Sequence, residues 1–179
     1  MVKIAVVVAN GFEEIEALAP VDIFRRAGFQ CEMIGLTSIL VEGSHAIKVE
    51  ADSLFDGDLS QYDLIVLPGG MPGSTNLRDD DRLIVELQKA VTNGKYVAAI
   101  CAAPIVLDRA GLLDGRHYTC FPGKEVEISS GIHLVENVVV DGPIITSRGA
   151  GTSLEFAYRL VDLLGGDGQG LAKVMVYQI

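Results

Sequence analysis

The stretch YVAAICAAP, residues 96–104, joins a strand-like segment to a helix-like segment through a single cysteine. Residues 96–100 have the apolar character of a buried strand, and residues 102–110 have helical character. A residue at such a join sits on a sharp turn, close to the backbone N–H groups of the next helix, which favour the reactive thiolate. The stretch therefore predicts a nucleophile elbow that carries the thiol of Cys101. The alternative is a small buried residue that packs helix against strand.

Outward from this stretch, strand-like and helix-like segments alternate along the chain. Apolar runs predict buried strands at residues 3–9, 29–36 and 63–67, and shorter strands at 118–121, 137–140 and 144–147. Helical spacing predicts helices at 14–27, 79–94, 152–164 and 170–178, with a kink or local break at Pro20. A small hairpin is expected over Ser44 and His45, and a loop at 71–76. We expect one domain over residues 1–179, a three-layer α/β/α sandwich around a mostly parallel sheet.

Four segments of unusual composition follow predicted strands. They are residues 10–16, 68–73, 101–104 and 147–151. Ligands of open α/β sheets bind outside the carboxyl ends of the strands. We therefore expect these four segments to meet at one edge of the sheet and to form the site.

The charge, hydropathy and cysteine content of the chain argue against several kinds of partner and site. The 179 residues carry a formal net charge of −10, so the surface repels phosphate groups, and we expect no dedicated nucleic-acid or anionic-membrane partner. No apolar run approaches the roughly 18–20 residues that span a bilayer. The three cysteines, Cys31, Cys101 and Cys120, are widely spaced, which argues against a disulfide framework and against a zinc site. We expect Cys31 to lie in the core of a strand and Cys120 to have a packing role near the pocket. We also expect the protein to reside in the cytoplasm.

Six motifs occur in order along the chain. They are NGFEEIE (10–16), PVD (20–22), RRAG (25–28), LPGG (67–70), AAICAAP (98–104), and TSRG with GTS (146–149 and 151–153). Together, at this spacing, they resemble the ThiJ/PfpI superfamily, in the branch of the Parkinson-disease protein DJ-one and its bacterial relatives. The resemblance covers nearly the whole chain and implies the flavodoxin-like sandwich shared with class I glutamine amidotransferases.

The resemblance implies roles for the residues at matching positions. Cys101 matches the family's reactive cysteine, and Glu16 matches the carboxyl group that hydrogen-bonds its sulfur. The N–H groups of Gly70 and Ala102 match the anion-binding donors, and Gly69 belongs to the same turn. An ionised Glu16 opposes thiolate formation, whereas a protonated Glu16 can donate a hydrogen bond to the thiolate. We therefore expect the two groups to titrate as a coupled pair, with Glu16 largely protonated when Cys101 is charged.

These positions also have a purely structural interpretation. Gly69 and Gly70 alone indicate only a tight turn. A carboxylate in the first turn of a helix is often solvated, and this fits Glu13 and Glu14 better than Glu16.

The chain departs from the family's pattern at positions where relatives have other side chains. Human-type proteins carry a histidine where this chain has Phe121, so a mechanism with histidine as general base is not supported. The peptidase branch has a histidine directly after the cysteine, where Ala102 stands, which argues against a protease. His45 falls where relatives often have an arginine near the anion pocket. We favour a hairpin-tip role for His45 and an anion contact for Arg26.

Two function classes follow from the resemblance. In the first, the Cys101 thiolate adds to methylglyoxal, glyoxal or their adducts on amines, while Glu16 moves a proton and Gly70 and Ala102 hold the oxyanion. The product is a hydroxy acid, as in a glyoxalase or deglycase. In the second, Cys101 oxidises without turnover, as in an oxidative-stress sensor or redox chaperone. We expect no cofactor and no metal, small reactive carbonyls or glycated amines as partners, and a homodimer.

Overall fold

A seven-stranded sheet forms the centre of the computed structural model, which describes residues 1–178. Its strand order is β10-β11-β7-β6-β1-β2-β5, and only the β10–β11 pair is antiparallel. The strands are β1 (Lys3–Val8), β2 (Gln30–Gly35), β5 (Ser53–Leu54), β6 (Leu64–Leu67), β7 (Tyr96–Ile100), β10 (Val138–Asp141) and β11 (Ile144–Ser147). Two small pairs lie outside this sheet: β3 (Leu40–Glu42) with β4 (Lys48–Glu50), and β8 (His117–Tyr118) with β9 (Ile132–His133).

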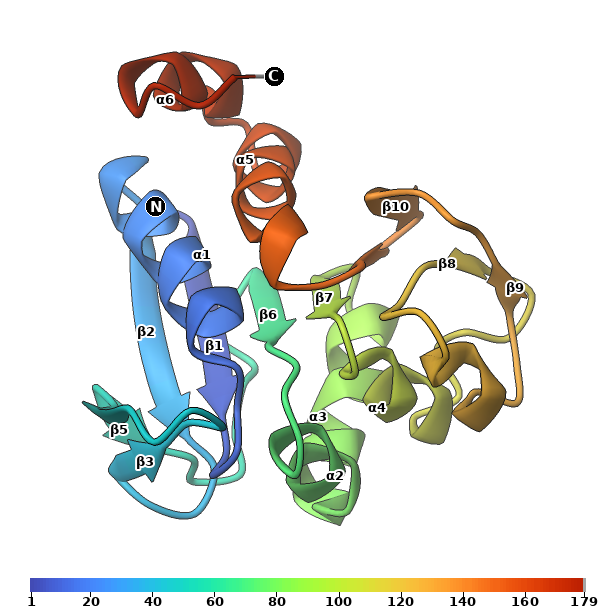
Figure 1. The fold of residues 1–179 in the computed structure, drawn as a ribbon. Coiled ribbons are helices and arrows are strands. Elements are labelled where there is room, and N and C mark those ends of the chain that lie inside the picture. Colours follow the sequence, from blue (N-terminus) through green and yellow to red (C-terminus); the bar gives the residue numbers. More distant parts are fainter. Residues whose placement is uncertain (179) are drawn as a thin grey trace.

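Helices cover both faces of the sheet (Figure 1). One face holds α1 (Glu14–Arg26), α5 (Ser153–Leu163) and α6 (Gly168–Val174), and the other holds α2 (Gly73–Arg78), α3 (Asp81–Thr92) and α4 (Pro104–Arg109). The side chains of β1 alternate between the two layers, as the pleat of a strand requires. Ile4, Val6 and Val8 pack on the α1 side, and Ala5 and Val7 pack on the α3 side. The predicted three-layer sandwich with a mostly parallel sheet is confirmed.

One predicted feature of the helical layers is wrong, and of the two alternatives predicted at Pro20, a kink or a local break, the break does not occur. Residues 71–76 were expected to form a loop, but α2 begins at Gly73 and buries Leu77 in the core below α4. Helix α1 also continues through Pro20 without a break. Packing outweighs the lost backbone donor there, because the α1 face around Ala17 and Phe24 is fully buried.

Three predicted boundaries also shift for local reasons. The helix after Cys101 begins only at Pro104, because the N–H of Ala103 donates to the carbonyl of Ile100 in a turn (3.0 Å). The strand expected at 118–121 ends at Tyr118, because the next N–H group, that of Thr119, donates to the Thr146 hydroxyl (2.9 Å). Helix α6 begins earlier than expected, where the Asp167 carboxylate accepts from a backbone N–H of its first turn.

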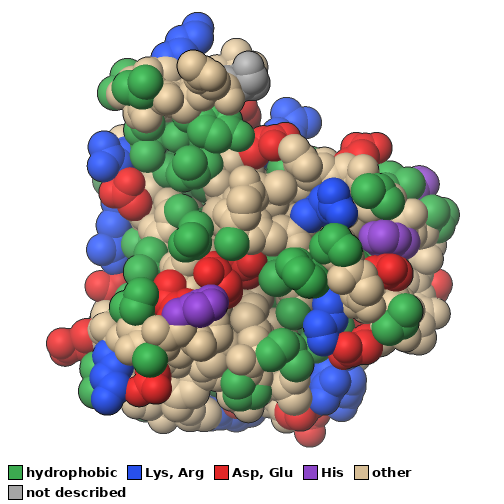
Figure 2. Space-filling model, viewed as in Figure 1, with side chains coloured by type: hydrophobic (Ala, Val, Ile, Leu, Met, Phe, Trp, Pro, Cys, Tyr) green, Lys and Arg blue, Asp and Glu red, His purple; other side chains and the backbone are tan. Residues whose placement is uncertain are grey.

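The surface mixes charges and carries apolar side chains along one helix. On the face drawn in Figure 2, Lys and Arg side chains are scattered among Asp and Glu, and hydrophobic side chains gather on the α1–α5 side below α6. Ile15 and Leu18 of α1 are 54% and 36% exposed. Within residues 1–178, no helix combines the length and the apolar character that a bilayer crossing needs.

Candidate active site

Cys101 occupies the sharp turn that directly follows β7. Its φ is 65°, a left-handed conformation that is uncommon for a residue with a side chain. Two backbone hydrogen bonds hold this turn: the Cys101 N–H donates to the Ser147 carbonyl, and the Phe121 N–H donates to the Cys101 carbonyl, both at 2.9 Å. The predicted elbow is therefore present, and the reactive atom is fixed by strands on either side of it.

Glu16 places a fully buried carboxyl group beside Cys101 from the first turn of α1. Its Oε2 accepts a hydrogen bond from the Gly69 N–H at 2.9 Å. Its Oε1 is buried and has no hydrogen-bond partner among residues 1–178. Because Oε2 already accepts a hydrogen bond and Oε1 has no partner, Oε1 is the oxygen on which a proton is expected. Burial is the main cause that raises the pKa of Glu16 to about 7, so the protonated form is well populated near neutral pH.

The sulfur of Cys101 experiences opposing influences. Burial and a charged Glu16 raise the pKa of the thiol, because each disfavours a negative charge on sulfur. The backbone N–H groups of Gly70 and Ala102 hydrogen-bond to the sulfur and lower it. Transfer of the thiol proton to Glu16 removes the opposing charge and leaves both N–H groups to the thiolate. The pKa of the thiol is raised to about 12 while Glu16 is charged. We therefore expect the reactive form to be a thiolate beside a protonated Glu16, with the two groups titrating as one pair.

The turn after β6 has room for glycine only. At Gly70 φ is 88°, and an added Cβ would overlap backbone atoms of the 11–13 segment. At Gly69 an added Cβ would lie 2.6 Å from the Cys101 Cβ and would collide with Oε2 of Glu16. This close approach lets the N–H of Gly69 reach Glu16 while the N–H of Gly70 reaches the sulfur.

The four segments predicted to form the site do meet at the carboxyl edge of the sheet. The 10–16 and 68–73 segments are joined by the Glu13 N–H, which donates to the Gly69 carbonyl at 2.8 Å. The hydrogen bond between Cys101 and Ser147 joins the other two. Gly149, in the 147–151 segment, lies next to Glu16, since an added Cβ there would be 4.0 Å from Oε1 of Glu16.

This arrangement has a counterpart among known proteins. A family model described as "DJ-1/PfpI family" matches residues 2–163. The chain belongs to the DJ-1/PfpI family. The flavodoxin-like sandwich expected from the sequence motifs is confirmed by DJ-1 structures of the same fold.

Relatives of this DJ-1/PfpI chain come from plants, archaea and a protozoan. It is 40% identical over 172 residues to Protein DJ-1 homolog B of Arabidopsis thaliana. The match includes 94% of this chain but only 39% of the plant protein. A deglycase of Pyrococcus horikoshii is 33% identical over 149 residues, covering 82% of the chain and 89% of the relative. The solved structure of Toxoplasma gondii DJ-1, oxidized, has a TM-score of 0.95 at 34% identity and covers both chains completely.

The structure does not bring Arg26 to this DJ-1/PfpI site. Arg26 lies in the last turn of α1, where its Nε donates to the Asp22 carboxylate at 2.7 Å. Ten residues of helix separate it from Glu16, a distance of about 15 Å along the axis.

His45 lies at the tip of the β3–β4 hairpin, as predicted, but its partner was not foreseen. Its backbone N–H and its Nδ1 lie 2.7 and 2.8 Å from the carboxylate oxygens of Glu14. The expectation of a solvated Glu14 is wrong: only 4% of it is exposed, because the hairpin packs over it. Glu13 instead caps α1, accepting from the N–H of Glu16 at 2.8 Å.

Phe121 stands at the rim of the site, next to the turn that carries Cys101. Its ring is half-exposed and borders Gly149, whose added Cβ would lie 3.4 Å from the ring. A phenyl ring has no proton to exchange, so Glu16 is the titratable group placed beside the sulfur. Residues 147–151 were expected at the site, but the roles of two backbone groups there, the Ser147 carbonyl that holds Cys101 and the Gly149 backbone beside the Phe121 ring, were not predicted.

The replacement Gly69→Ala tests the close approach at this site. We expect it to destabilise the fold by about 1–3 kcal/mol, because the methyl group must displace Glu16 or Cys101, and to lower thiol reactivity. Urea unfolding and the rate of thiol alkylation measure the two effects. Gly151→Ala is the matched control, since an added Cβ there meets no described atom within 4 Å. Equal behaviour of the two variants would contradict the packing argument.

The raised pKa of Glu16 has a consequence for stability. The folded protein keeps this proton up to about pH 7, whereas an unfolded glutamic acid releases it near pH 4.5. Unfolding is therefore favoured as pH rises through this window, by up to about 3 kcal/mol. We expect Glu16→Gln to be more stable than the wild type at pH 8 and to lose that advantage at pH 4.5, measured by urea unfolding at both. An advantage independent of pH would show that folding does not raise the pKa of Glu16.

Proposed function

We propose that this DJ-1/PfpI protein converts reactive carbonyls, namely methylglyoxal, glyoxal or their early adducts on amines, to hydroxy acids. The observation that carries the proposal is the pairing of the Cys101 sulfur with the buried carboxyl of Glu16, whose pKa is raised to about 7. Two backbone N–H groups beside the sulfur add donors for a developing oxyanion. The similarity to a deglycase of Pyrococcus horikoshii supports this substrate class.

In the first step, the Cys101 thiolate forms a bond to the aldehyde carbon of methylglyoxal. The aldehyde oxygen becomes an alkoxide, which the N–H groups of Gly70 and Ala102 stabilise, and Glu16 then protonates it. The result is a hemithioacetal. The carboxylate of Glu16, freed by this transfer, is the base for the next step.

In the second step, the Glu16 carboxylate removes the proton from the former aldehyde carbon while the neighbouring carbonyl oxygen takes a proton from water, which gives an enediol. Glu16 then returns its proton to the neighbouring carbon, and the hydroxyl group on the former aldehyde carbon releases its proton to water. This isomerisation converts the hemithioacetal into a thioester of lactic acid. Water then cleaves the thioester and regenerates the thiol. The net reaction is addition of one water to methylglyoxal to give lactate, so it consumes no external oxidant or reductant.

A separate cavity lies near the same edge of the sheet, and neither Cys101 nor Glu16 is among the residues that line it. This cavity, of about 600 Å³, lies between the β3–β4 hairpin and the loop that carries Met71 and Pro72, and Gly11 forms part of its wall. The Gly11 carbonyl accepts a hydrogen bond at 3.2 Å from the N–H of Gly73, the first residue of α2.

Methylglyoxal consumption with quantification of lactate tests the proposal. We expect many molecules of lactate for each molecule of protein. Loss of one equivalent of methylglyoxal per thiol, without lactate, would overturn it.

A second function rests on the same sulfur. The N–H groups of Gly70 and Ala102 are placed to hold the oxygens of a sulfinate, and the related Toxoplasma gondii DJ-1 structure is of an oxidized form. In this alternative, two molecules of hydrogen peroxide each transfer one oxygen to the thiolate and leave as water. Peptide mass spectrometry after peroxide treatment would find two oxygen atoms on Cys101 alone, with no turnover of carbonyls.

The exposed residues of α1 suggest how the chain assembles. We propose a homodimer that covers Ile15 and Leu18, two apolar side chains left exposed on a surface helix. Sedimentation equilibrium would find twice the chain mass, and Ile15→Glu would shift it to the monomer. Cytoplasmic residence and a single domain stay predictions.

A further inference from the structure

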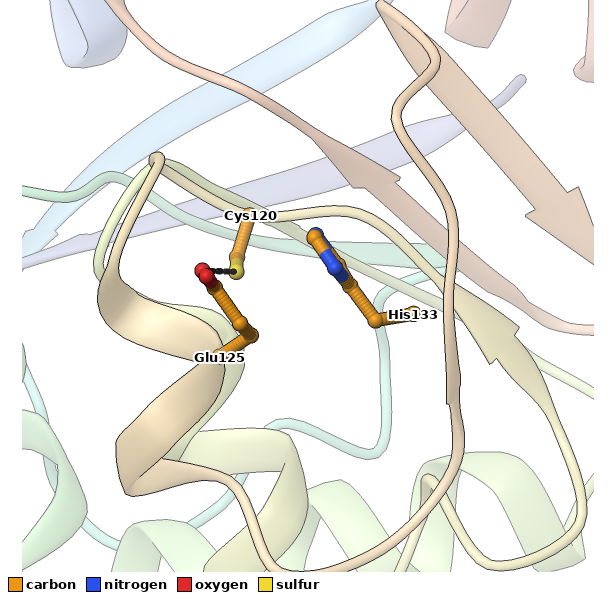
Figure 3. Close-up of side chains that lie close together, drawn as sticks. All are labelled: Cys120, Glu125 and His133. Carbon is orange, nitrogen blue, oxygen red and sulfur yellow. Dashed lines mark hydrogen bonds between the residues drawn. The ribbon is translucent and has the colours of Figure 1, made fainter.

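A second cluster of reactive side chains lies outside the proposed catalytic pair. Cys120 follows β8, Glu125 belongs to a short 3-10 helix (Lys124–Glu127), and His133 is the last residue of β9. One ligand atom of each lies within 4.8 Å of the other two. Figure 3 shows the Glu125 carboxylate facing the Cys120 sulfur, with the His133 ring beside them. A sulfur, a nitrogen and an oxygen donor therefore converge from three separate segments.

Each of these side chains is held in place by a contact independent of the other two. The pairing of β8 with β9 places His133 opposite Tyr118, and their rings lie 5.5 Å apart. The Glu125 carboxylate accepts a hydrogen bond from the Gly123 N–H at 2.7 Å. Cys120 is only 1% exposed, so its sulfur has little freedom. Outer contacts of this kind orient ligands for a metal.

We propose that Cys120, Glu125 and His133 bind a zinc ion, with the fourth tetrahedral position open to water. Zinc accepts thiolate, imidazole and carboxylate ligands together, whereas magnesium and calcium select oxygen. Zinc–ligand bonds of about 2.0–2.3 Å place tetrahedral ligand atoms about 3.3–3.8 Å apart. The Sγ of Cys120 already lies 4.0 Å from Oε2 of Glu125. Glu125 and His133 are both half-buried, so small rotations of their side chains from the surface can complete the site.

This site would act on the loop that borders Cys101. Cys120 directly precedes Phe121, whose N–H donates to the Cys101 carbonyl. A bound ion would therefore fix the segment from Cys120 to Glu125 at the rim of the proposed active site. The wide spacing of the three cysteines does not exclude this site, because the cluster contains only one cysteine.

Cobalt(II), a spectroscopic substitute for zinc, tests the site in the full-length Cys101→Ser protein. That background removes the other pocket thiol and the proposed activity, so the result is independent of the proposed function. We expect one equivalent of cobalt, a near-ultraviolet band from thiolate-to-cobalt charge transfer, intense visible bands of tetrahedral cobalt, and displacement by zinc. Added Cys120→Ser should abolish the charge-transfer band, and added His133→Asn should weaken zinc binding by about 100-fold.

Cys31→Ser in the same background is the control, because Cys31 lies in the core of β2 on the other side of the molecule's central strands, and binding should be unchanged. Circular dichroism checks folding, and the surface change Glu125→Gln provides a further variant if Cys120→Ser unfolds. The proposal would be overturned if the Cys101→Ser protein showed no charge-transfer band with cobalt. It would also be overturned if neither His133→Asn nor Glu125→Gln weakened zinc binding.

Discussion

Replacement of Cys101 by serine is expected to lower kcat/KM for methylglyoxal by about 1000-fold or more. A serine hydroxyl at this elbow would keep the backbone and its two N–H donors, but it ionises far less readily than a thiol. Glu16, with its pKa raised to about 7, is too weak a base to remove that proton. Steady-state formation of lactate by wild type and variant, at equal concentrations of folded protein, measures the effect.

Cys31→Ser is the matched control for this experiment, because it removes a thiol that is buried in β2, away from the carboxyl edge. Only 7% of Cys31 is exposed and it packs in the core, so this thiol has no access to a substrate. Full activity in Cys31→Ser and none in Cys101→Ser is the expected pattern. Substantial lactate formation by Cys101→Ser would mean that the nucleophile lies elsewhere.

Glu16→Gln is expected to lower kcat by about 100-fold and to change its pH dependence. In the wild type, the fully protonated pair has no thiolate, so kcat/KM should rise with pH through about 7, where the pair loses its first proton. Glutamine cannot receive the proton of Cys101. The thiol then titrates alone, and burial raises its pKa, so the rise should move to higher pH.

The pH profile separates this role of Glu16 from a merely structural one. A variant that only distorts the pocket would lose rate at every pH and keep the rise near pH 7. Glu50→Gln is a suitable control, because Glu50 is an exposed carboxylate on β4 whose charge does not contribute to the pKa shift of Glu16 or of Cys101. An unchanged profile in Glu16→Gln would contradict the coupled pair.

The elbow could be predicted because its signal is local. A strand-like run, one cysteine and a helix-like run are contiguous, and the fold places them as the pattern indicates. Glu16 and the Gly69–Gly70 turn followed from the family resemblance together with the rule that sites form at the carboxyl edge. The burial of Glu16 within the site agrees with that placement.

Features that depend on distant docking could not be predicted. Glu14 is buried because a hairpin some 30 residues later packs over it, and no pattern around Glu14 indicates this. Strands β5 and β9 contain two residues each, too few for any periodicity. The cluster of Cys120, Glu125 and His133 depends on the pairing of one of these strands, so its members stand unrelated in the sequence.

The left-handed backbone at Cys101 implies a conflict between two selective pressures. A cysteine in this conformation costs about 1 kcal/mol or more relative to glycine, which adopts it freely. A population of variants sorted for thermal resistance alone would accordingly favour glycine at position 101, and sorting for carbonyl resistance would restore cysteine. At this turn, thermal stability therefore favours glycine, whereas the proposed reactivity requires cysteine.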